Sequence, residues 1–388
     1  MKNRVLLIGI FFFVIFSLIT WKLVDVQILE HQQWLSKANS LQKREIKTQP
    51  KRGKIYDQRG NPLALNVKAY SIAVDSYNMT KPEVLVSILH KFLPMSEKEI
   101  RSLIYRKSYF TWIARQVEYS KAQQIKQTAD KRGADGLLFV DSWKRVYPYQ
   151  KLGGHVLGFT GVDYHGLAGL EYSMDDTLSG SPAVTELVYG ADRTAYRMRV
   201  KKAETPGHNL HLTMDNRIQH IVQQELEEGV ERFQAKKGWS VVIEPNTGNV
   251  LAMAQTINYD PNHYNKYPQR TRRNLSVSYT FEPGSIMKAF TALAALDSGI
   301  ATPDTVVDGD SPVTISGHNI HNAQYKDWGQ ITFTEAIQNS VNTGIIRIAQ
   351  RLGENRLYTH LVNLGFGSET EIRIPGEQSG KLRALRNW

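Results

Sequence analysis

The sequence predicts an α+β protein with one N-terminal membrane helix followed by two folded regions. Residues 5–21 form an uncharged apolar run of seventeen residues, at the short end of what a helix needs to cross a bilayer. Behind this run, strand-like segments with glycine turns alternate with segments of helical spacing, and the pattern restarts at Pro206. The sequence contains no cysteine, which excludes disulfide scaffolds, thiolate metal sites and cysteine nucleophiles.

The apolar run predicts an uncleaved membrane anchor. Lys2 and Arg4 precede it, and Trp21 closes it at the position where a headgroup contact is expected. No small-x-small cleavage site follows, since Lys22 comes next, so we prefer an anchor to a secretory signal peptide. Residues 1–24 are therefore expected to form a cytoplasmic tip and a transmembrane helix.

Positive charge is concentrated beside this anchor. The chain has 48 Lys and Arg against 37 Asp and Glu, a net charge of +11, and eleven of the basic residues but only four of the acidic ones lie in residues 1–60. A basic segment next to a membrane helix indicates contact with anionic headgroups. Because no zinc-finger, RNP-like or basic-zipper pattern accompanies it, nucleic acid is not an expected partner.

The rest of the chain divides at residue 206. Residues 25–205 mix strands, glycine turns and helical spacing without a concentration of nucleophile, base and acid, which indicates a pedestal rather than a catalytic domain. Residues 206–388 begin with a strand at 209–213 and a helix from Asn216. They continue with a hairpin whose strands, around 239–244 and 250–254, flank a glycine-containing loop.

The first chemical pattern lies after a proline-glycine turn at residues 283–284. Ser285 falls in the first turn of the helix that follows, and Lys288, three residues on, shares its face. A serine at a helix N-terminus gains stabilisation for developing negative charge, and a lysine whose pKa is lowered by burial can accept its proton. Ser-x-x-Lys alone is a weak signal, because residues 40–43 match it too.

A second pattern follows about fifty residues later. Thr332 and Glu335 form a capping box that starts a helix, and another helix is expected from Thr343. Ser340 and Asn342 occupy the junction between the two helices. A hydroxyl can pass a proton to a leaving amine, and an amide can orient a substrate peptide. Ser-x-x-Lys followed by Ser-x-Asn is the pair of motifs found in penicillin-binding proteins and class A β-lactamases.

With these motifs the chain resembles the class B penicillin-binding proteins, the monofunctional membrane-anchored D,D-transpeptidases of bacterial cell-wall synthesis, of the division or sporulation type. In the N-terminal region the resemblance rests on Arg52-Gly-Lys-Ile-Tyr-Asp-Gln-Arg-Gly-Asn-Pro-Leu-Ala64, Arg145-Val-Tyr-Pro148, His155-Val-Leu-Gly158 and Gly169-Leu-Glu171. In the C-terminal region it rests on Arg272-Arg-Asn274, Tyr279, Glu282-Pro-Gly-Ser285, Gly365-Phe-Gly367 and Pro375-Gly-Glu377. Together the motifs span nearly the whole chain.

The resemblance implies a mechanism. Ser285 would attack the penultimate D-Ala carbonyl of a stem peptide, and Lys288 would accept its proton as D-Ala leaves. Ser340 would shuttle the proton, Asn342 would hold the peptide, and the backbone N–H of Ser285 would be half of an oxyanion hole. A neighbouring strand's amine would resolve the acyl-enzyme, and β-lactams would acylate the same serine. No cofactor and no metal are expected.

The resemblance also implies a location, partners and an architecture. The chain would be a single-pass protein of the bacterial cell membrane with its bulk outside the cytoplasm. It would act on stem peptides and the lipid-linked precursor, together with a polytopic glycosyltransferase and other division or elongation proteins. Residues 25–205 would form the pedestal or dimerisation domain. Residues 206–388 would be the N-terminal part of a β-lactamase-like transpeptidase domain, an antiparallel sheet flanked by helices.

One family motif is not found. No Lys-Thr/Ser-Gly follows Asn342, and Lys381 is followed by Leu382 and Arg383, so we expect a chain truncated before this motif, with an incomplete sheet. Two alternatives to the transpeptidase follow. One is a catalytically impaired scaffold that binds cell-wall synthesis partners, and the other is a serine β-lactamase or β-lactam sensor.

Two weaker signals are interpreted as structural. His318 and His321 have the spacing of a metal pair, but no supporting carboxylate or third histidine accompanies them. A cluster of three arginines, Arg270, Arg272 and Arg273, is expected to be a solvated loop.

Overall fold

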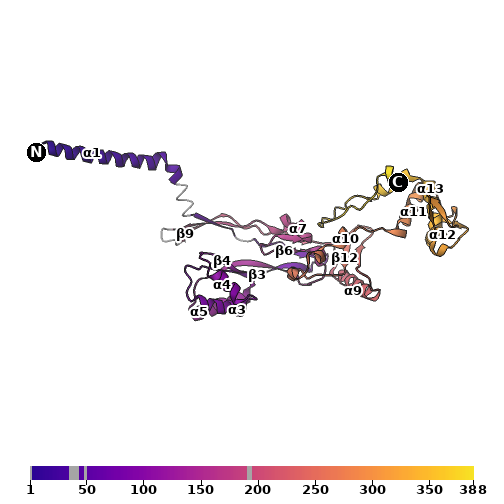
Figure 1. The fold of residues 1–388 in the computed structure, drawn as a ribbon, viewed down its shortest axis with the longest axis horizontal. Coiled ribbons are helices and arrows are strands. Elements are labelled where there is room, and N and C mark those ends of the chain that lie inside the picture. Colours follow the sequence, from indigo (N-terminus) through magenta and orange to yellow (C-terminus); the bar gives the residue numbers. More distant parts are fainter. Residues whose placement is uncertain (1, 35–42, 48–49, 190–194) are drawn as a thin grey trace. The chain divides into compact units, whose positions relative to one another are not determined.

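The computed structural model describes residues 2–34, 43–47, 50–189 and 195–388 (Figure 1). These residues form two compact units. Unit 1 consists of residues 1–216 and 260–263, and unit 2 of residues 217–259 and 264–388. Helices and mainly antiparallel strands occur in both, which confirms the predicted α+β class.

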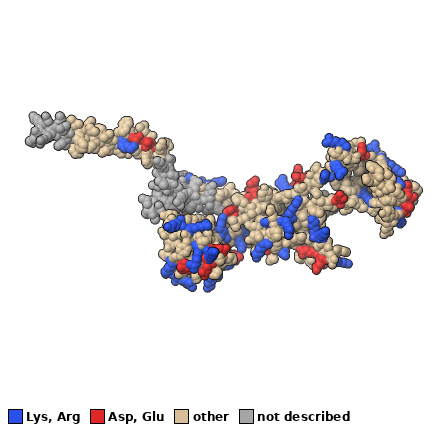
Figure 2. Space-filling model, viewed as in Figure 1, with Lys and Arg blue, Asp and Glu red and all other residues tan. Residues whose placement is uncertain are grey.

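The N-terminal helix α1 (Lys2–Val24) continues into a π-helical turn, η1 (Asp25–Leu29). Residues Gly9–Leu29 are long and apolar enough to cross a membrane, and none of them is buried. In Figure 2 the described part of this helix is tan until charged residues appear near its C-terminal end, where Lys22 and Asp25 form an ion pair of 2.7 Å. The structure therefore contains the apolar helix that the sequence predicts.

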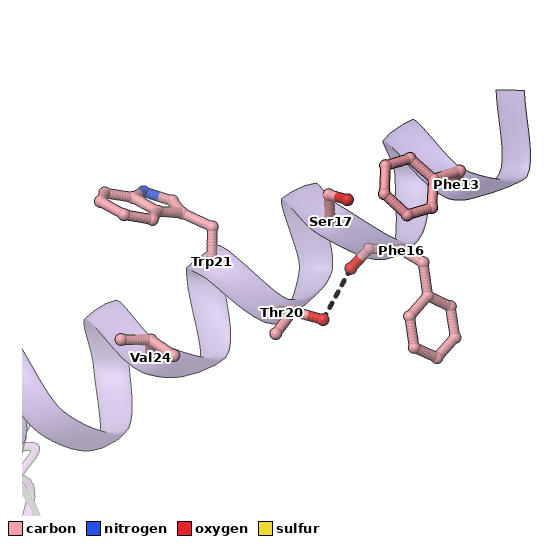
Figure 3. A pocket seen from close by; sticks show the side chains of 6 residues that line it. All are labelled: Phe13, Phe16, Ser17, Thr20, Trp21 and Val24. Carbon is pink, nitrogen blue, oxygen red and sulfur yellow. Dashed lines mark hydrogen bonds between the residues drawn. The ribbon is translucent and has the colours of Figure 1, made fainter. Parts of the chain in front are cut away.

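One face of α1 carries a shallow recess among aromatic rings (Figure 3). Ser17 and Thr20 lie in this recess between Phe13, Phe16 and Trp21. The Thr20 hydroxyl donates a hydrogen bond of 2.8 Å to the Phe16 carbonyl, so its polar atom is satisfied within the helix. An apolar surrounding requires such internal satisfaction.

Unit 1 is built on a five-stranded sheet with the long strand β3 at its centre. β3 is antiparallel to β2, β4 and β5, and β10 pairs parallel with β2. The strands are β2 (Ile55–Tyr56), β3 (Pro62–Val74), β4 (Thr111–Glu118), β5 (Leu137–Val146) and β10 (Leu210–His211).

Three helices pack on one face of this sheet: α3 (Pro82–Phe92), α4 (Glu97–Ile104) and α5 (Tyr119–Arg132) (Figure 1). Ser96 and Glu99 form a capping box at the start of α4, and Gly133 ends α5 in a left-handed conformation. Their outer faces carry interspersed basic and acidic residues (Figure 2). The core between helices and sheet is apolar and includes Ile72, Val74, Leu85, Leu89, Ile100, Ile113 and Ile125.

The remainder of unit 1 is a set of short elements. A three-stranded sheet has the order β1-β8-β9, and β6 pairs with β7. Gly166 in β7 has no room for a side chain, because a Cβ there would lie 1.7 Å from the Glu171 carbonyl oxygen. The elements are β1 (Lys43–Lys47), α6 (Gly154–Leu157), β6 (Phe159–Thr160), β7 (Gly166–Ala168), α7 (Gly169–Ser173), α8 (Asp175–Ser179), β8 (Val184–Tyr189) and β9 (Ala195–Lys202).

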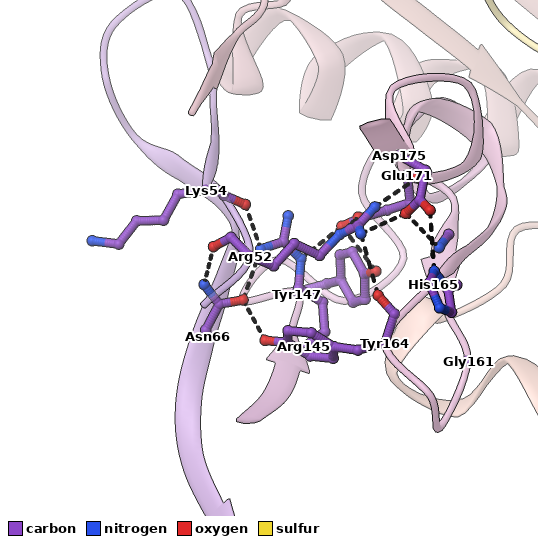
Figure 4. A network of polar contacts seen from close by, with 12 residues as sticks. Arg52, Lys54, Asn66, Arg145, Tyr147, Gly161, Tyr164, His165, Glu171 and Asp175 are labelled. Atoms are coloured by element: carbon purple, nitrogen blue, oxygen red, sulfur yellow. Dashed lines mark hydrogen bonds and ion pairs between the residues drawn. The ribbon is translucent and has the colours of Figure 1, made fainter. Parts of the chain in front are cut away.

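A buried charge network joins these elements to the sheet (Figure 4). Glu171 is fully buried, and its two carboxylate oxygens accept from Arg52 Nε and Arg145 Nε, each at 2.6 Å. Arg52 also donates to Asp175 at 2.6 Å. Tyr147 is buried as well and donates its hydroxyl to Glu171 at 3.2 Å. Three segments distant in sequence are thereby held together by one carboxylate.

Burial and hydrogen bonding within this network shift the pKa values of Tyr147 and Asp175. Burial raises the pKa of Tyr147 well above its ordinary value, so its hydroxyl stays a donor to Glu171. Burial alone would raise the pKa of Asp175, but hydrogen bonds from Gly166 N and Arg52 outweigh it, and the pKa of Asp175 lies below its ordinary range.

Unit 2 contains the predicted hairpin. β11 (Trp239–Ile243) and β12 (Val250–Gln255) are antiparallel, and among the described strands β11 pairs with β12 alone. Helix α9 (Asn216–Arg232) is attached to this hairpin through Gln219, whose buried side-chain amide bonds both the N–H and the carbonyl of Met253. Short elements follow: η2 (Pro261–Lys266), η3 (Gln269–Arg272) and α10 (Leu275–Ser278).

The rest of unit 2 is a helical cluster with two small antiparallel strand pairs, β13–β16 and β14–β15. Its core includes Ala295, Val307, Phe333, Ala336, Ile345 and Ile348. The helices are η4 (Gly284–Ile286), α11 (Met287–Asp297), η5 (Ala323–Tyr325), α12 (Phe333–Gln338), α13 (Asn342–Leu352), α14 (Glu354–Asn363) and η6 (Leu385–Asn387). The strands are β13 (Val306–Asp308), β14 (Val313–Ile315), β15 (His318–Ile320) and β16 (Gln330–Thr332).

Replacing Glu171 by glutamine removes the charge between two buried guanidinium groups and keeps the shape. We expect Glu171→Gln to lower the free energy of unfolding of unit 1 by about 3–5 kcal/mol, the cost of breaking a buried ion pair. Denaturant unfolding followed by circular dichroism measures the loss. The matched control is Glu118→Gln, because the Glu118 carboxylate is 62% exposed and pairs with Lys144 at 3.3 Å; its expected cost is below about 1 kcal/mol. Equal losses would contradict the central role of Glu171.

Candidate active site

Ser285 and Lys288 lie at the start of one helical segment. Gly284 has a left-handed backbone, with φ of 61°, and opens the 3₁₀ turn η4, which leads directly into α11. Ser285 lies in this 3₁₀ turn and is exposed, and its hydroxyl makes no hydrogen bond within the described part of the chain. Lys288 is in the first turn of α11 and is half-buried. The spacing allows a contact between Ser285 and Lys288, but the Lys288 ammonium instead bonds Ser340 and Asn342.

Ser340 and Asn342 lie at the junction of α12 and α13, as the sequence predicts. The capping box of Thr332 and Glu335 at the start of α12 is confirmed in both directions. α12 ends at Gln338, and α13 begins at Asn342. Ser340 is thus in the short link between the helices, and Asn342 is the first residue of α13.

The link at Ser340 is a Schellman motif. Ser340 has a φ of 51°, Val341 N donates to Ala336 O at 2.9 Å, and Ser340 N donates to Ile337 O at 3.1 Å. Glycine is the usual residue at this position, because a Cβ in the left-handed region costs about 1–2 kcal/mol. Ser340 therefore stands in a strained conformation, a feature that clusters at functional sites.

Lys288 connects α11 to this junction. Its Nζ donates to the Ser340 carbonyl at 2.6 Å, to Ser340 Oγ at 2.9 Å and to Asn342 Oδ1 at 2.6 Å. An ammonium has three N–H donors, so all three are used. The left-handed backbone of Ser340 lets one residue present both its carbonyl and its hydroxyl to the same nitrogen.

Partial burial lowers the pKa of Lys288 below its ordinary value of 10.5, because desolvation disfavours the charged form. The three oxygen acceptors stabilise the ammonium and oppose this shift. A lysine with a lowered pKa loses its proton more readily near neutral pH and can then serve as a base.

The side-chain amide of Asn342 is fixed at both ends. Its Oδ1 accepts from Lys288, and its Nδ2 donates to the His321 carbonyl at 2.8 Å. Rotating the amide by half a turn would place its NH2 group against the ammonium and its oxygen against a carbonyl. The orientation of Asn342 is therefore determined by its two neighbours.

The structure thus brings three of the four predicted residues into direct contact, Lys288, Ser340 and Asn342. Ser285 precedes Lys288 in the same helical segment. The sequence missed the support of the Asn342 amide by the His321 carbonyl. This contact is made by the backbone, so no side-chain motif could have revealed it.

Three other sequence signals remain: the second Ser-x-x-Lys match, the histidine pair and the arginine cluster. Ser40, in the second Ser-x-x-Lys match, lies outside the described residues. His318 is the first residue of β15, and the His321 ring nitrogen Nδ1 lies 3.1 Å from Ser311 Oγ. In the described part of the chain no three His, Asp or Glu residues are grouped so that they could hold a metal ion. In the arginine cluster, Arg273 donates to Ser278 Oγ at 2.8 Å.

Two protein-family models match the chain. Residues 47–212 match the penicillin-binding protein dimerisation domain, and residues 238–388 match the penicillin-binding protein transpeptidase domain.

The chain is also similar to curated proteins along most of its length. The chain is 30% identical to the peptidoglycan D,D-transpeptidase FtsI of Escherichia coli, over 90% of this chain and 59% of that protein. It is 29% identical to the stage V sporulation protein D of Bacillus subtilis, over 99% of this chain and 60% of that protein. The chain therefore spans about three fifths of the length of these relatives.

A solved structure shares the fold. It is the complex between a penicillin-binding protein, PBP2, and MreC from Helicobacter pylori, with a TM-score of 0.69 and 21% identity. The similarity covers 86% of this chain and 68% of that one.

The two matched domains and the Ser-Lys and Ser-Asn motifs define a penicillin-binding protein. Because a dimerisation domain precedes the transpeptidase domain, and because the relatives match over most of the chain, this chain belongs to the class B penicillin-binding proteins.

The strain at Ser340 can be measured with two substitutions that both remove the hydroxyl. We expect Ser340→Gly to unfold with a free energy about 1 kcal/mol higher than Ser340→Ala, because glycine carries no Cβ penalty in the left-handed region. Denaturant unfolding of the two variants gives the difference. The control pair is Ser298→Gly and Ser298→Ala at the end of α11, where φ is −77° and alanine should be the more stable. The same sign at both positions would contradict backbone strain at Ser340.

Proposed function

We propose that this chain carries the acyl-transfer site of a peptidoglycan D,D-transpeptidase, with Ser285 as nucleophile and Lys288 as its base. One observation carries the proposal: Lys288, one helical turn after Ser285, is held by Ser340 and Asn342 of a separate motif. A nucleophile, a base with a lowered pKa and a second hydroxyl are the groups that serine acyl transfer needs.

In the proposed acylation, neutral Lys288 takes the proton of Ser285 as Oγ bonds to the penultimate D-Ala carbonyl carbon of a stem peptide. The peptide C–N bond then breaks, and the proton passes through Ser340 Oγ to the leaving amine of the terminal D-Ala. Ser285 keeps the acyl group as an ester. An amine of a neighbouring stem peptide attacks this ester, forms the cross-link and returns the proton to Ser285.

The other two roles follow from the same site. Asn342 would hold the stem peptide with the hydrogen-bonding capacity that Lys288 and His321 leave unused, and the backbone N–H of Ser285 would stabilise the tetrahedral oxyanion. A β-lactam would acylate Ser285 by the same attack, with its ring nitrogen as the leaving group.

The location and partners belong to the same proposal. α1 would anchor the chain in the bacterial cell membrane as a single span, and residues 25–388 would lie outside the cytoplasm. Residues 25–205 would act as pedestal and residues 206–388 as the transpeptidase portion. The partners would be stem peptides, the lipid-linked precursor, a membrane glycosyltransferase and other proteins of division or elongation. In the Helicobacter pylori complex, a penicillin-binding protein of the same fold is bound to another protein, MreC.

A second candidate is a scaffold that binds such partners without catalysis. It is favoured by one observation, the pairing of β11 with β12 alone among the described strands. A β-lactamase or β-lactam sensor is disfavoured, because it needs no pedestal matching the dimerisation domain.

Covalent labelling tests the proposal. We expect a fluorescent penicillin to form a stable adduct with the detergent-solubilised chain. The adduct should be absent from Ser285→Ala and should persist in Ser298→Ala, a substitution at the opposite end of α11. Intact-mass spectrometry measures the adduct. A folded chain without adduct would leave the scaffold as the function, and an adduct released within minutes would indicate a β-lactamase.

The pH dependence of labelling tests the role of Lys288. Asn342→Asp places a carboxylate where the neutral Oδ1 now lies 2.6 Å from the ammonium, which raises the pKa of Lys288. Above its pKa Lys288 is neutral, so we expect the rising limb of the acylation rate to move to higher pH. Stopped-flow labelling between about pH 6 and 10 measures the shift. Asn355→Asp, in the exposed first turn of α14, adds the same charge and should leave the profile unchanged. An unshifted Asn342→Asp profile would exclude Lys288 as the base.

A further inference from the structure

The first turn of α13 is capped from a distance. The residue at its N-cap is Val341, which has no side-chain acceptor, so the backbone N–H groups of the turn need partners elsewhere. Asn322, twenty-one residues earlier in sequence, supplies one of them: its Oδ1 accepts from the N–H of Thr343 at 3.1 Å. A side chain outside the helix thus performs the capping role.

The Asn322 side chain is buried, with 5% of its surface exposed, and its amide is fully bonded. Nδ2 donates to the Gly309 carbonyl at 2.8 Å and to the Lys326 carbonyl at 2.9 Å. Oδ1 accepts from Thr343 N and lies 3.2 Å from Thr343 Oγ1, which also donates to Gly309 O at 2.9 Å. One amide therefore joins both ends of the 309–326 segment to the start of α13.

Two neighbouring pairs of residues face each other at this point. The carbonyl of His321 accepts from the side chain of Asn342, while the side chain of Asn322 accepts from the backbone of Thr343. Because 321 is adjacent to 322, and 342 to 343, fixing the second contact fixes the position of the first. The His321 carbonyl in turn determines which end of the Asn342 amide faces Lys288.

We propose that Asn322 is a positioning residue for the acyl-transfer site: through its contacts with Thr343 and Gly309 it holds the His321 carbonyl where it orients the amide of Asn342 toward Lys288. Asn322 itself does not touch the reacting atoms. This inference rests on the proposed function of Ser285 and Lys288, and it assigns a role to a segment that no catalytic motif includes.

A purely structural role predicts a different result from a positioning role. If Asn322 only stabilised unit 2, its loss would slow the reaction to the same extent whether or not Asn342 has an amide. If it acts through Asn342, its loss matters only while that amide is present. A double-variant cycle separates the two cases.

The experiment compares the labelling rate by a fluorescent penicillin in the full chain and in Asn322→Ala, Asn342→Ala and the double variant. We expect Asn322→Ala to slow acylation about tenfold or more in the native background, as small misplacements of catalytic groups do, and less than about twofold in the Asn342→Ala background. Equal slowing in both backgrounds would overturn the proposal.

Two further variants keep the test independent of folding. Gln219→Ala removes another buried amide of unit 2, one that bonds the backbone of β12, and should lower the unfolding temperature without slowing acylation. If Asn322→Ala does not fold, Thr343→Val replaces it in the cycle, because valine keeps the shape and removes the hydroxyl that bonds Gly309 O. We expect the same pattern with a smaller effect.

A readout without acylation distinguishes failure of this inference from failure of the proposed function. In ¹⁵N spectra, the side-chain amide protons of Asn342 are assigned by their loss in Asn342→Ala, and the proton bonded to the His321 carbonyl should be shifted from its position in a free asparagine amide. Asn322→Ala should move this shift toward that of the free amide. Unchanged shifts would overturn the positioning role, whether or not the chain reacts with penicillin. Altered shifts in a chain that does not react would support the positioning role and refute the function.

Discussion

The contact between the Lys288 ammonium and three oxygens of the α12–α13 junction is the constraint on which the candidate site depends. It joins two segments 52 residues apart, and it accounts for two features of the junction that are otherwise costly. The left-handed backbone of Ser340 presents two acceptors at once, and the fixed amide of Asn342 presents the third. Since the ammonium has only three donors, these three contacts use all of its protons. The geometry of the site therefore follows from the need to give each donor of one ammonium an acceptor.

Unit 1 is organised by the same principle with the opposite sign of charge. Glu171 has no exposure to solvent, so each of its oxygens needs a donor within the protein, and Arg52 and Arg145 supply them from distant segments. A buried ion pair adds little to stability compared with an apolar core of the same volume, but it is intolerant of partial loss. Such a network favours one arrangement of the short elements around β6 and β7 over the many that apolar packing alone would permit. The network thus fixes the arrangement of the chain in a region with little regular secondary structure.

The sequence predicted what is local. The capping box at Thr332 and the hairpin of β11 and β12 follow from residues within a few positions of one another, and both are present. The Ser-Lys and Ser-Asn patterns could be associated only through a family resemblance, because nothing in their spacing brings α11 to the α12–α13 junction. The left-handed conformation of Ser340 could not be predicted, since the motif usually ends in glycine. Neither could the caps and networks formed by Asn322 and Glu171, because a polar residue in a turn-rich segment gives no sign of its burial.

The three acceptors around Lys288 differ in what they can do when the lysine loses its proton. A neutral amine has two donors and a lone pair, so one of the three oxygens must lose its hydrogen bond. The Ser340 carbonyl and Asn342 Oδ1 can only accept, whereas the Ser340 hydroxyl can rotate and donate its proton to the lone pair. Ser340 Oγ is thus the one partner able to reverse its role, and a proton relay requires such a reversal. It follows that a strained serine at this position, rather than the unstrained glycine typical of the motif, is what a Lys288-based acyl transfer needs.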